Sequence, residues 1–290
     1  MMLQVRYFLV AVQFFTRVPI TGRLAQWMGF EPSWISRCTR FFPLIGLLLG
    51  LLLAALFNTL LLVFNQGISI IVTTVVGILV TGAFHEDGFA DFCDGFGGGQ
   101  TPERIITIMR DSRVGAYGAI GIVLMLLAKI QALSSLDAVW VGAALVIGHS
   151  ASRGFAVIIM ILLPYVETKI TNKINLARDA KEDEVRMDEV QMVEVQVDTV
   201  KADRVKPVAA GLLLTDWLPA LCFGFAPAIL LAWTFDAWLP IGCGFLGATV
   251  VSMWMWRTLR RRLGGYTGDT LGATQQLAET IFYLGMLATV

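Results

Sequence analysis

Acidic side chains are concentrated in the segment HEDGFADFCDGFGGG, residues 85–99. Asp87, Asp91 and Asp94 are spaced by four and three residues, so a helix would bring them to one face, and Glu86 stands beside them. Neighbouring carboxylates repel one another and lose hydration near a bilayer, which is unfavourable unless a cation lies among them. Hard oxygen ligands favour Mg²⁺ or Mn²⁺. The block therefore predicts a Mg²⁺ site, against the alternative of a solvated acidic face at a membrane boundary.

Glycines and arginines that suit a phosphate follow this block. Gly97 and Gly98 leave the backbone free to adopt positive φ and to point amides at an anion. In the next segment, RDSRVGAYG, Arg110 and Arg113 offer forked donors that match phosphate oxygens. The alternative for these arginines is the basic flank of a membrane helix. A metal, a glycine turn and arginines are what phosphoryl transfer requires, so that chemistry is predicted here.

A second polar block, RRRLGGYTGDTLGATQQLAE, begins at residue 260. Its three arginines are interpreted as a membrane anchor, because a basic cluster commonly flanks a span. Gly265 and Gly268 precede Asp269, and an aspartate set among glycines is not needed for anchoring. We therefore predict Asp269 as a catalytic residue, and Gly265 and Gly268 as backbone that binds the ligand.

Polar side chains also interrupt the apolar runs. His149 and Arg153 are four residues apart and so share a helix face. A charge inside a membrane normally faces the protein interior and marks function. Two interpretations of Arg153 stay open: contact with the ligand, or an internal ion pair with Asp216 or a site aspartate. Lys129 lies near the outer end of its own run, and its ammonium group is predicted to extend to the membrane surface.

Membrane helices must position these residues. Of the 290 residues, 56% are hydrophobic and 15% are charged, and the mean hydropathy of +0.71 is far above that of a soluble domain. Six apolar runs are long enough to span a bilayer, at residues 43–64, 68–84, 116–134, 138–163, 211–234 and 238–256. A seventh run, 271–290, opens with polar residues and is either a half-buried helix or a full span. The prediction is an all-α, polytopic membrane protein of a single domain, 1–290, with six or seven transmembrane helices.

The placement of basic residues predicts how the spans are oriented. The joints at residues 65–67, 135–137 and 235–237 contain no Lys or Arg, so they should lie outside. The opposite side collects most of the basic residues and should be the cytoplasm. We expect a multi-pass protein of the cell inner membrane with cytoplasmic active-site loops. No small-residue cleavage site follows the first apolar run, which ends at Pro19, so this segment is expected to remain as an interfacial helix.

Residues 165–207 form the one long polar insertion and should be cytoplasmic. Val or Met alternates with polar residues through 184–205, which predicts one or two amphipathic strands, the alternative being a solvated connecting loop. The 22 basic and 22 acidic residues cancel, so no nucleic-acid partner is expected. The four cysteines form no CxxC pair, and neither disulfides nor a zinc site is expected. Whether copies associate into a homo-oligomer stays open.

Six blocks together resemble the cobalamin synthase family: FFTRVP, FPLIGLLLG, HEDGFADFCDGFGGG, IMRDSRVGAYG, SRG, and LGGYTGDTLGA with its trailing LAE. They run in order from residue 8 to about 285, and only the stretch 180–205 departs from the family pattern. The resemblance implies an adenosylcobinamide-GDP ribazoletransferase. In that reaction a hydroxyl of α-ribazole, or of its 5′-phosphate, attacks the cobinamide-linked phosphate of adenosylcobinamide-GDP and releases GMP.

The resemblance also implies roles for the residues above. The four acidic residues of the first block would hold Mg²⁺ on the diphosphate, and Arg110 and Arg113 would steady its oxygens. Either Asp91 or Asp269 would act as the base. Two alternatives remain. A CDP-alcohol-type phosphotransferase of phospholipid synthesis would use the same metal chemistry on a lipid acceptor, and an ion-coupled transporter would use acidic residues within its spans. Against the transporter, the acids cluster at span ends and no inverted repeat is visible.

Overall fold

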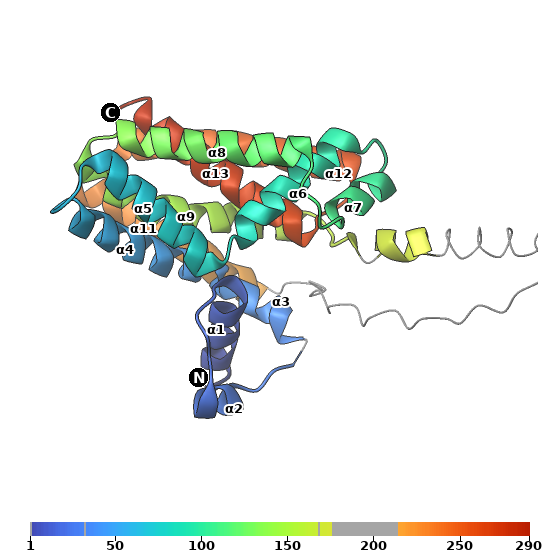
Figure 1. Cartoon of the computed structure of the whole chain (residues 1–290). Coiled ribbons are helices and arrows are strands. Elements are labelled where there is room, and N and C mark those ends of the chain that lie inside the picture. The colour runs from blue at the N-terminus through green and yellow to red at the C-terminus, as the bar shows by residue number, and fades with distance from the viewer. Residues whose placement is uncertain (1, 32, 168, 176–213) are drawn as a thin grey trace, which may run out of the picture.

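The computed structural model describes residues 2–31, 33–167, 169–175 and 214–290 (Figure 1). These residues contain no strand and only an isolated bridge between Tyr165 and Tyr266, which confirms the all-α prediction. The strands predicted within 184–205 lie outside them. The helices are α1 (Met2–Phe15), α2 (Gly22–Met28), α3 (Trp34–Cys38), η1 (Thr39–Phe41), α4 (Phe42–Leu60), α5 (Gln66–Thr81), α6 (Phe84–Gly98), α7 (Pro102–Met109), α8 (Ala116–Ser135), α9 (Ala138–Leu162), α11 (Leu214–Thr234), α12 (Trp238–Arg262) and α13 (Gly268–Leu287).

Several helices are long and apolar enough to cross a membrane, so the protein is polytopic. In the described part of the chain there are five such stretches: Trp34–Leu60, Ala116–Ser135, Ala138–Leu162, Trp217–Thr234 and Trp238–Arg262. The pair α5 and α6 passes the same test jointly, although the two helices are bent by 88°, and would make a sixth crossing. The span predicted at 68–84 is thus only the first part of a bent pair, because α5 ends at Thr81.

The bundle has two distinct ends (Figure 1). The hairpin end carries the short joints at residues 61–65, 136–137 and 235–237, which connect α4 to α5, α8 to α9, and α11 to α12. The loop end carries α7 and the connections that precede α8 and α13, at residues 110–115 and 263–267. The arginines and glycines predicted to bind phosphate are therefore at or near the loop end.

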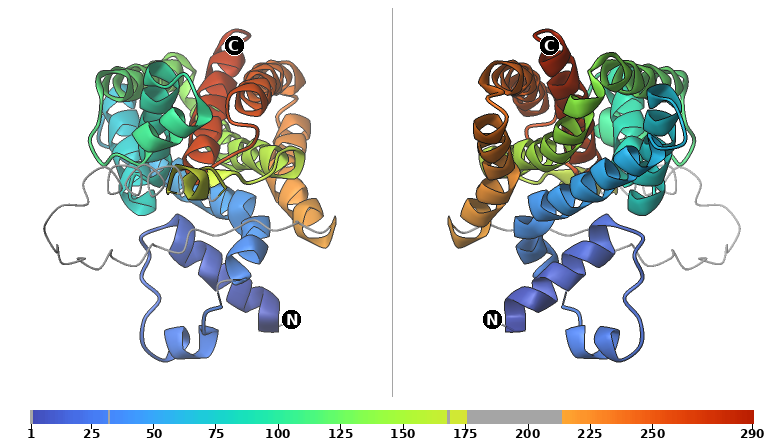
Figure 2. Two further views of the ribbon diagram at one scale, coloured as in Figure 1. Left: turned by 90° about the vertical axis from the view of Figure 1, so that its right-hand side faces the viewer. Right: turned by 90° about the vertical axis from the view of Figure 1, so that its left-hand side faces the viewer.

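Helix α13 is the buried centre of the bundle. It packs against α6, α8, α9 and α12, and Figure 2 shows it enclosed by them when the bundle is viewed along its length. Phe282 belongs to the main apolar core. Gln275, Gln276 and Glu279 are buried as well, although they are polar. The seventh run predicted at 271–290 is therefore an interior helix, whose polar residues face protein and not lipid.

A sharp turn between α5 and α6 directs the first polar block. Gly82 has φ 67° and Ala83 has φ 57°, both left-handed, and they end α5. Arg17 covers this turn, since its backbone N–H donates to Val80 O at 2.7 Å and a Cβ on Gly82 would collide with its Nε. Position 82 therefore requires glycine both for its φ and for space. The turn sends α6 across α13.

Helices α1 to α3 form a separate layer beside the bundle. Figures 1 and 2 show α1 lying across the direction of the spans. Val10 and Phe15 of α1 pack with Trp34 of α3 in a second apolar cluster, which also takes residues from α4, α9 and α11. Exposed apolar side chains on α1 include Met2, Leu3 and Val5. This crosswise position agrees with the interfacial helix expected from the sequence.

Candidate functional site

The two polar blocks of the sequence meet where α6 crosses the start of α13. A Cβ on Gly88 would lie 2.9 Å from the carbonyl oxygen of Asp269, and a Cβ on Gly272 would lie 3.2 Å from that of His85. Thr267 begins α13 with a reciprocal capping box to Thr270, which fixes Asp269 in the first turn. The backbones approach this closely because both crossing positions are glycine.

Three carboxylates of these blocks remain accessible near this crossing. Asp87 is exposed, and Asp91 and Asp269 are half-buried. Asp87 and Asp91 are one helical turn apart and lie on the same face of α6. We call these three residues the open face.

The other two acidic residues of the first block have different surroundings. Asp94 is buried and accepts hydrogen bonds from the backbone N–H groups of Gly115 and Gly118, at 2.7 and 2.8 Å, so it caps the first turn of α8. Glu86 points away from the open face and accepts a hydrogen bond from Gln276 Nε2 at 2.8 Å. Within the described ranges, no three His, Cys, Asp or Glu residues are grouped closely enough to hold a metal by themselves. The four carboxylates predicted to bind Mg²⁺ thus do not form one preassembled cluster.

The glycines after the first block do not form the turn that the sequence predicted. Gly97 and Gly98 are the last residues of α6, and neither has positive φ. A Cβ on Gly97 would lie 2.6 Å from the ring of Tyr117, so this glycine makes room for the start of α8. The end of α6 is held by Arg262, which donates to the carbonyl oxygens of Phe96 and Gly99 at 2.8 and 2.5 Å. The expectation of free backbone amides at this position is therefore wrong.

The glycines of the second block differ from each other. Gly265 is buried, and a Cβ there would collide with the carbonyl oxygen of Pro164, so the loop before α13 lies directly against the segment after α9. Tyr266 N–H donates to that same oxygen at 2.9 Å, and Val166 N–H donates to Tyr266 O at 3.1 Å. Gly268 opens α13, and a Cβ there would have no atom within 4 Å. Of the two, Gly268 has the space to face a ligand.

The two predicted arginines point to different places. Arg110 Nε lies 3.5 Å from Glu167 Oε1, and Tyr165 Oη donates to the other oxygen of Glu167 at 2.6 Å. The pKa of the Tyr165 hydroxyl is raised above its ordinary value. Burial is the largest cause, followed by the negative charges of Glu167 and Asp269. Two contacts thus connect Arg110 through Glu167 with Tyr165, and the backbone of Tyr165 pairs with that of Tyr266, three residues before Asp269.

Arg113 instead pairs with its neighbour Asp111 at 2.7 Å. Its guanidinium holds the pKa of Asp111 down at about 2, through a side-chain hydrogen bond above all. Both side chains line a groove of about 670 Å³ that also includes Arg104, Asp94 and Tyr117. The structure therefore separates the two arginines that the sequence grouped together.

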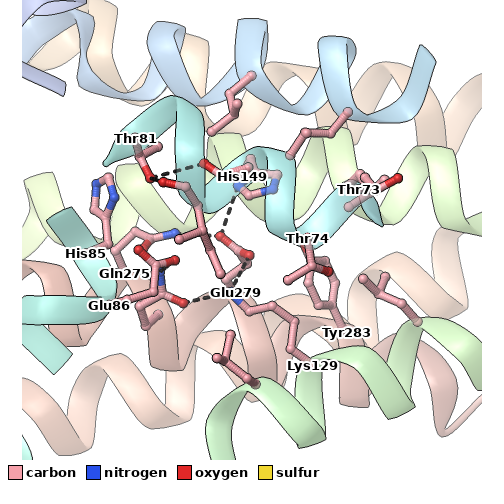
Figure 3. A pocket seen from close by; sticks show the side chains of 18 of the residues that line it. Thr73, Thr74, Thr81, His85, Glu86, Lys129, His149, Gln275, Glu279 and Tyr283 are labelled. Carbon is pink, nitrogen blue, oxygen red and sulfur yellow. Dashed lines mark hydrogen bonds and ion pairs between the residues drawn. The ribbon is translucent and has the colours of Figure 1, made fainter. Parts of the chain in front are cut away.

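A second polar site, which the sequence did not predict as a unit, lies inside the bundle (Figure 3). Glu279 of α13 is at its centre and is paired with Lys129 of α8 at 2.8 Å and with His149 Nδ1 of α9 at 3.1 Å. Lys129 Nζ also donates to Gln276 Oε1 at 2.6 Å. Lys129 is only 6% exposed, so the prediction that it extends to the membrane surface is wrong: an interior carboxylate holds it.

These side chains line a small cavity of about 30 Å³ between α4, α5, α6, α8, α9 and α13. Glu86 enters it from α6, and Thr73, Thr74 and Thr81 enter it from α5. We call this space the inner cavity. Glu86 and Glu279 lie inside it. The argument against a transporter, that the acidic residues cluster at span ends, therefore does not hold for these two residues.

Arg153 is buried at one side of the inner cavity. Its Nη1 donates to the carbonyl oxygen of His149 at 2.8 Å, and its guanidinium lies over the ring of Phe42, 5.4 Å from the centroid. A Cβ on Gly46 would lie 2.6 Å from Arg153 Cδ, so the glycine of the FPLIG block makes room for this side chain. Arg153 interacts electrostatically with Glu279 and Glu86 of the inner cavity. The side chain of Asp216, its other predicted partner, lies outside the described residues.

The sequence of this chain is similar to a known protein family and to several of its members. Residues 7–287 match the family model described as cobalamin-5-phosphate synthase. The chain is 37% identical over 290 residues to the adenosylcobinamide-GDP ribazoletransferase of Albidiferax ferrireducens, covering 97% of each chain. It is 34% identical over 308 residues to that of Polaromonas sp. strain JS666, covering 99% of this chain and 98% of the relative. It is 35% identical over 294 residues to that of Shewanella frigidimarina, covering 98% and 95%. No solved structure matches the chain.

Proposed function

This chain belongs to the cobalamin-5-phosphate synthase family, and on that premise we propose that it is an adenosylcobinamide-GDP ribazoletransferase of cobalamin synthesis. The observation that carries the proposal is the crossing of α6 and α13. There the backbone of Asp269 lies against Gly88, so two sequence blocks about 180 residues apart share one place in the membrane domain. A transferase that handles a diphosphate needs carboxylates and cations gathered in this way.

In the proposed reaction, a hydroxyl oxygen of α-ribazole, or of α-ribazole 5′-phosphate, forms a new bond to the cobinamide-linked phosphorus of adenosylcobinamide-GDP. The bond from that phosphorus to the bridging oxygen of the diphosphate breaks, and GMP leaves with the bonding electrons. The hydroxyl proton passes to a carboxylate of the open face, either Asp91 or Asp269. The products are adenosylcobalamin, or its 5′-phosphate, and GMP.

We propose that Mg²⁺ binds at the open face, held by Asp87 and Asp91. The donor set fits this ion because Mg²⁺ usually takes one or two carboxylates and completes its shell with water and substrate phosphates. The exposure of Asp87 and the partial exposure of Asp91 leave room for such ligands. When bound, Mg²⁺ would supply positive charge next to the diphosphate. Glu86 and Asp94, the other two predicted ligands, are already hydrogen-bonded to Gln276 and to backbone amides.

Arg110 is the arginine best placed to contact the diphosphate. It is linked through Glu167 to Tyr165, whose backbone pairs with that of Tyr266 just before α13. Its side chain is 40% exposed, so its remaining donors are available to a ligand. Arg113 faces the groove beside α7, and a role for it would place part of the nucleotide there.

We propose that the loop end faces the cytoplasm of a cell with an inner membrane. The joints of the hairpin end lack Lys and Arg, whereas Arg110, Arg113 and residues 260–262 gather toward the loop end. A cysteine introduced as Asn65→Cys, in a chain without the native cysteines, should react with an impermeant maleimide added outside intact cells. Glu103→Cys should react only after lysis. The reverse pattern would overturn the orientation.

The test of function is GMP release from adenosylcobinamide-GDP by membranes that contain the full chain. Either α-ribazole or its 5′-phosphate is supplied, with and without Mg²⁺. We expect turnover only with Mg²⁺, and none from Asp91→Ala inserted at the same level. Glu103→Gln, which changes a half-buried carboxylate paired with Lys173, serves as the matched control and should behave like the wild type. If no GMP appears with either acceptor while Mg²⁺ is present, the assignment is wrong, and a lipid alcohol becomes the next acceptor to try.

A further inference from the structure

A groove of about 670 Å³ opens at the loop end, where α6, α7 and the start of α8 lie together (Figure 1). We call it the α7 groove. It is lined by α7, by the connection between α7 and α8, and by Asp94 and Gly98 of α6. Its volume lies within the range of about 300–1,000 Å³ that is usual for small-molecule sites. The groove is therefore large enough to hold a nucleoside.

The α7 groove follows the open face along α6. Asp94 lines the groove and comes three residues after Asp91, which corresponds to about 4.5 Å of helix rise. Gly98 lines it further along the same helix, about 10 Å from Asp91 by the same measure. A substrate whose diphosphate lies at the open face can therefore place the nucleoside attached to that diphosphate in the groove.

Tyr117, in the first turn of α8, provides an aromatic surface in the α7 groove. A Cβ on Gly97 would lie 2.6 Å from its ring, so the ring rests directly on the backbone of α6. Tyr117 is nevertheless 60% exposed, so most of its surface is open. An aromatic ring that is supported by protein and open to the groove can stack a nucleobase, whichever base it is. Tyr117 therefore suits the base of a nucleotide.

Arg104 of α7 provides a cation in the same groove, and this cation has no acidic partner. Among the residues that the structure describes, no carboxylate lies within ion-pair distance of its guanidinium, whereas Arg113 is paired with Asp111. A guanidinium can donate two parallel hydrogen bonds to O6 and N7 of guanine. Adenine cannot accept both, because it presents an amino group in place of O6. Arg104 therefore suits guanine better than adenine.

We propose that the α7 groove binds the guanosine of the nucleotide-activated substrate, with the base stacked on Tyr117 and its O6 and N7 atoms facing Arg104. This inference rests on the proposed function, in which GMP is the leaving group. The metal, the diphosphate and the reacting phosphorus stay at the open face. The groove holds the part of the leaving group that takes no part in the chemistry, and it selects guanine over other bases.

Substitutions of Tyr117 test the stacking. Tyr117→Leu removes the ring and should weaken GMP binding about 5- to 100-fold, the usual effect of losing one base–aromatic stack. Tyr117→Phe keeps the ring and should retain most of the affinity. The matched control is Trp238→Leu, which removes a 52% exposed aromatic residue from the first turn of α12 at the hairpin end. If Tyr117 is only an aromatic residue of the membrane interface, Tyr117→Leu will bind GMP as the control does, and the proposal is wrong.

Substitution of Arg104 tests the selection of guanine. Arg104→Gln should reduce the preference for GMP over AMP about 5- to 100-fold, because glutamine matches N6 and N7 of adenine instead of O6 and N7 of guanine. Arg261→Gln changes an exposed arginine of α12 outside the groove and should keep the wild-type preference. If Arg104→Gln weakens GMP and AMP binding equally, Arg104 contacts the phosphate, and the assignment of guanine to it is wrong.

The experiment is equilibrium binding of radiolabelled GMP and AMP to the purified full chain in lipid nanodiscs with Mg²⁺. The same samples are assayed for GMP release from adenosylcobinamide-GDP. There Tyr117→Leu should raise KM and leave kcat nearly unchanged, because the base contributes binding and no chemistry. A wild type that binds GMP no better than AMP would also overturn the proposal. GMP release by that wild-type sample would show that the proposed function still holds, so the two failures are distinguishable.

Discussion

Two acidic regions of this protein, only one residue apart along α6, have opposite characters. The open face presents Asp87, Asp91 and Asp269, which are exposed or half-buried at the crossing of α6 and α13. The inner cavity encloses Glu86 and Glu279, and its carboxylates are matched by Lys129 and other cationic or polar groups of the same bundle. The first region is accessible to ions and substrates, whereas the second is enclosed and contains its own cations.

This difference indicates a division of labour. Carboxylates on an accessible face can take a metal ion and a proton from substrates, at little cost to folding. Carboxylates in a low-dielectric interior must be paired, and removing one partner leaves an uncompensated charge. Substitutions at the open face should therefore lower activity and leave stability unchanged, while substitutions of the inner ion pairs should lower stability.

The largest effect is expected at the open face. Asp91→Asn keeps the size of the side chain but removes its charge and its ability to accept a proton, so GMP release should fall about 1,000-fold. The thermal unfolding midpoint in detergent should stay at the wild-type value. Glu103→Gln on α7 removes a carboxylate that is half-buried, as Asp91 is, and should change neither quantity. If the thermal unfolding midpoint of Asp91→Asn falls below that of the wild type, Asp91 stabilises the fold. The proposed difference between the open face and the inner cavity would then be wrong.

The inner cavity should respond in the opposite way. Lys129→Met removes the cation 2.8 Å from Glu279, and the buried carboxylate left behind should lower the free energy of unfolding by about 3 kcal/mol. Denaturant unfolding followed by tryptophan fluorescence measures this loss. Lys173→Met disrupts an ion pair of the same composition whose lysine is 74% exposed, and should have no measurable effect.

The double variant Lys129→Met/Glu279→Gln sharpens this prediction. It removes the uncompensated charge as well as the pair, so it should be more stable than Lys129→Met alone. If it is less stable than the single variant, the carboxylate contributes to stability mainly through His149 and Gln275.

The sequence predicts the open face far better than the inner cavity, and distance along the chain explains why. Asp87 and Asp91 are one helical turn apart, so composition and helical spacing reveal them together. The inner cavity takes residues from each of six helices. Lys129 and its partner Gln276 are 147 residues apart, and neither is unusual within its own helix. A single lysine near the end of an apolar run is normally predicted to reach the membrane surface. Only the packing between helices shows that Lys129 points inward.

The fold shows the same contrast. Apolar length is a local property, so the helices and most spans follow from hydropathy. The 88° bend after α5 and the burial of α13 do not, because both depend on contacts with distant segments. Arg17 covers the turn at Gly82, and Gln276 and Glu279 of α13 contact Lys129 of α8. The last apolar run contains polar residues at 274–276 and 279, which is unusual for a span that faces lipid. These polar residues were the one feature of the sequence that indicated an interior helix.

The crossing of α6 and α13, which positions the open face, can be tested at Gly88. Gly88→Ala would place a Cβ 2.9 Å from the carbonyl oxygen of Asp269, so α13 must move by a few tenths of an ångström or more. Displacement of catalytic groups on that scale should lower GMP release by up to about 100-fold while the substrates still bind. Gly242→Ala in α12 has no atom within 4 Å of the new methyl group and serves as the control, with activity unchanged. Equal activity of both variants would show that the crossing does not set the geometry of the site.

The smallest effect should separate the two arginines. Arg110 is linked through Glu167 and Tyr165 to the loop that precedes α13, so Arg110→Gln should lower GMP release by about 10-fold, the usual effect of losing a hydrogen bond to a charged group. Arg113 is engaged by Asp111, whose pKa of about 2 keeps this exposed pair ionised at every pH at which the enzyme would be assayed. Arg113→Gln should therefore change GMP release less than Arg110→Gln between about pH 6 and about pH 8. The opposite order would move the diphosphate to the groove beside Tyr117, and the open face would then hold only the metal and the reacting hydroxyl.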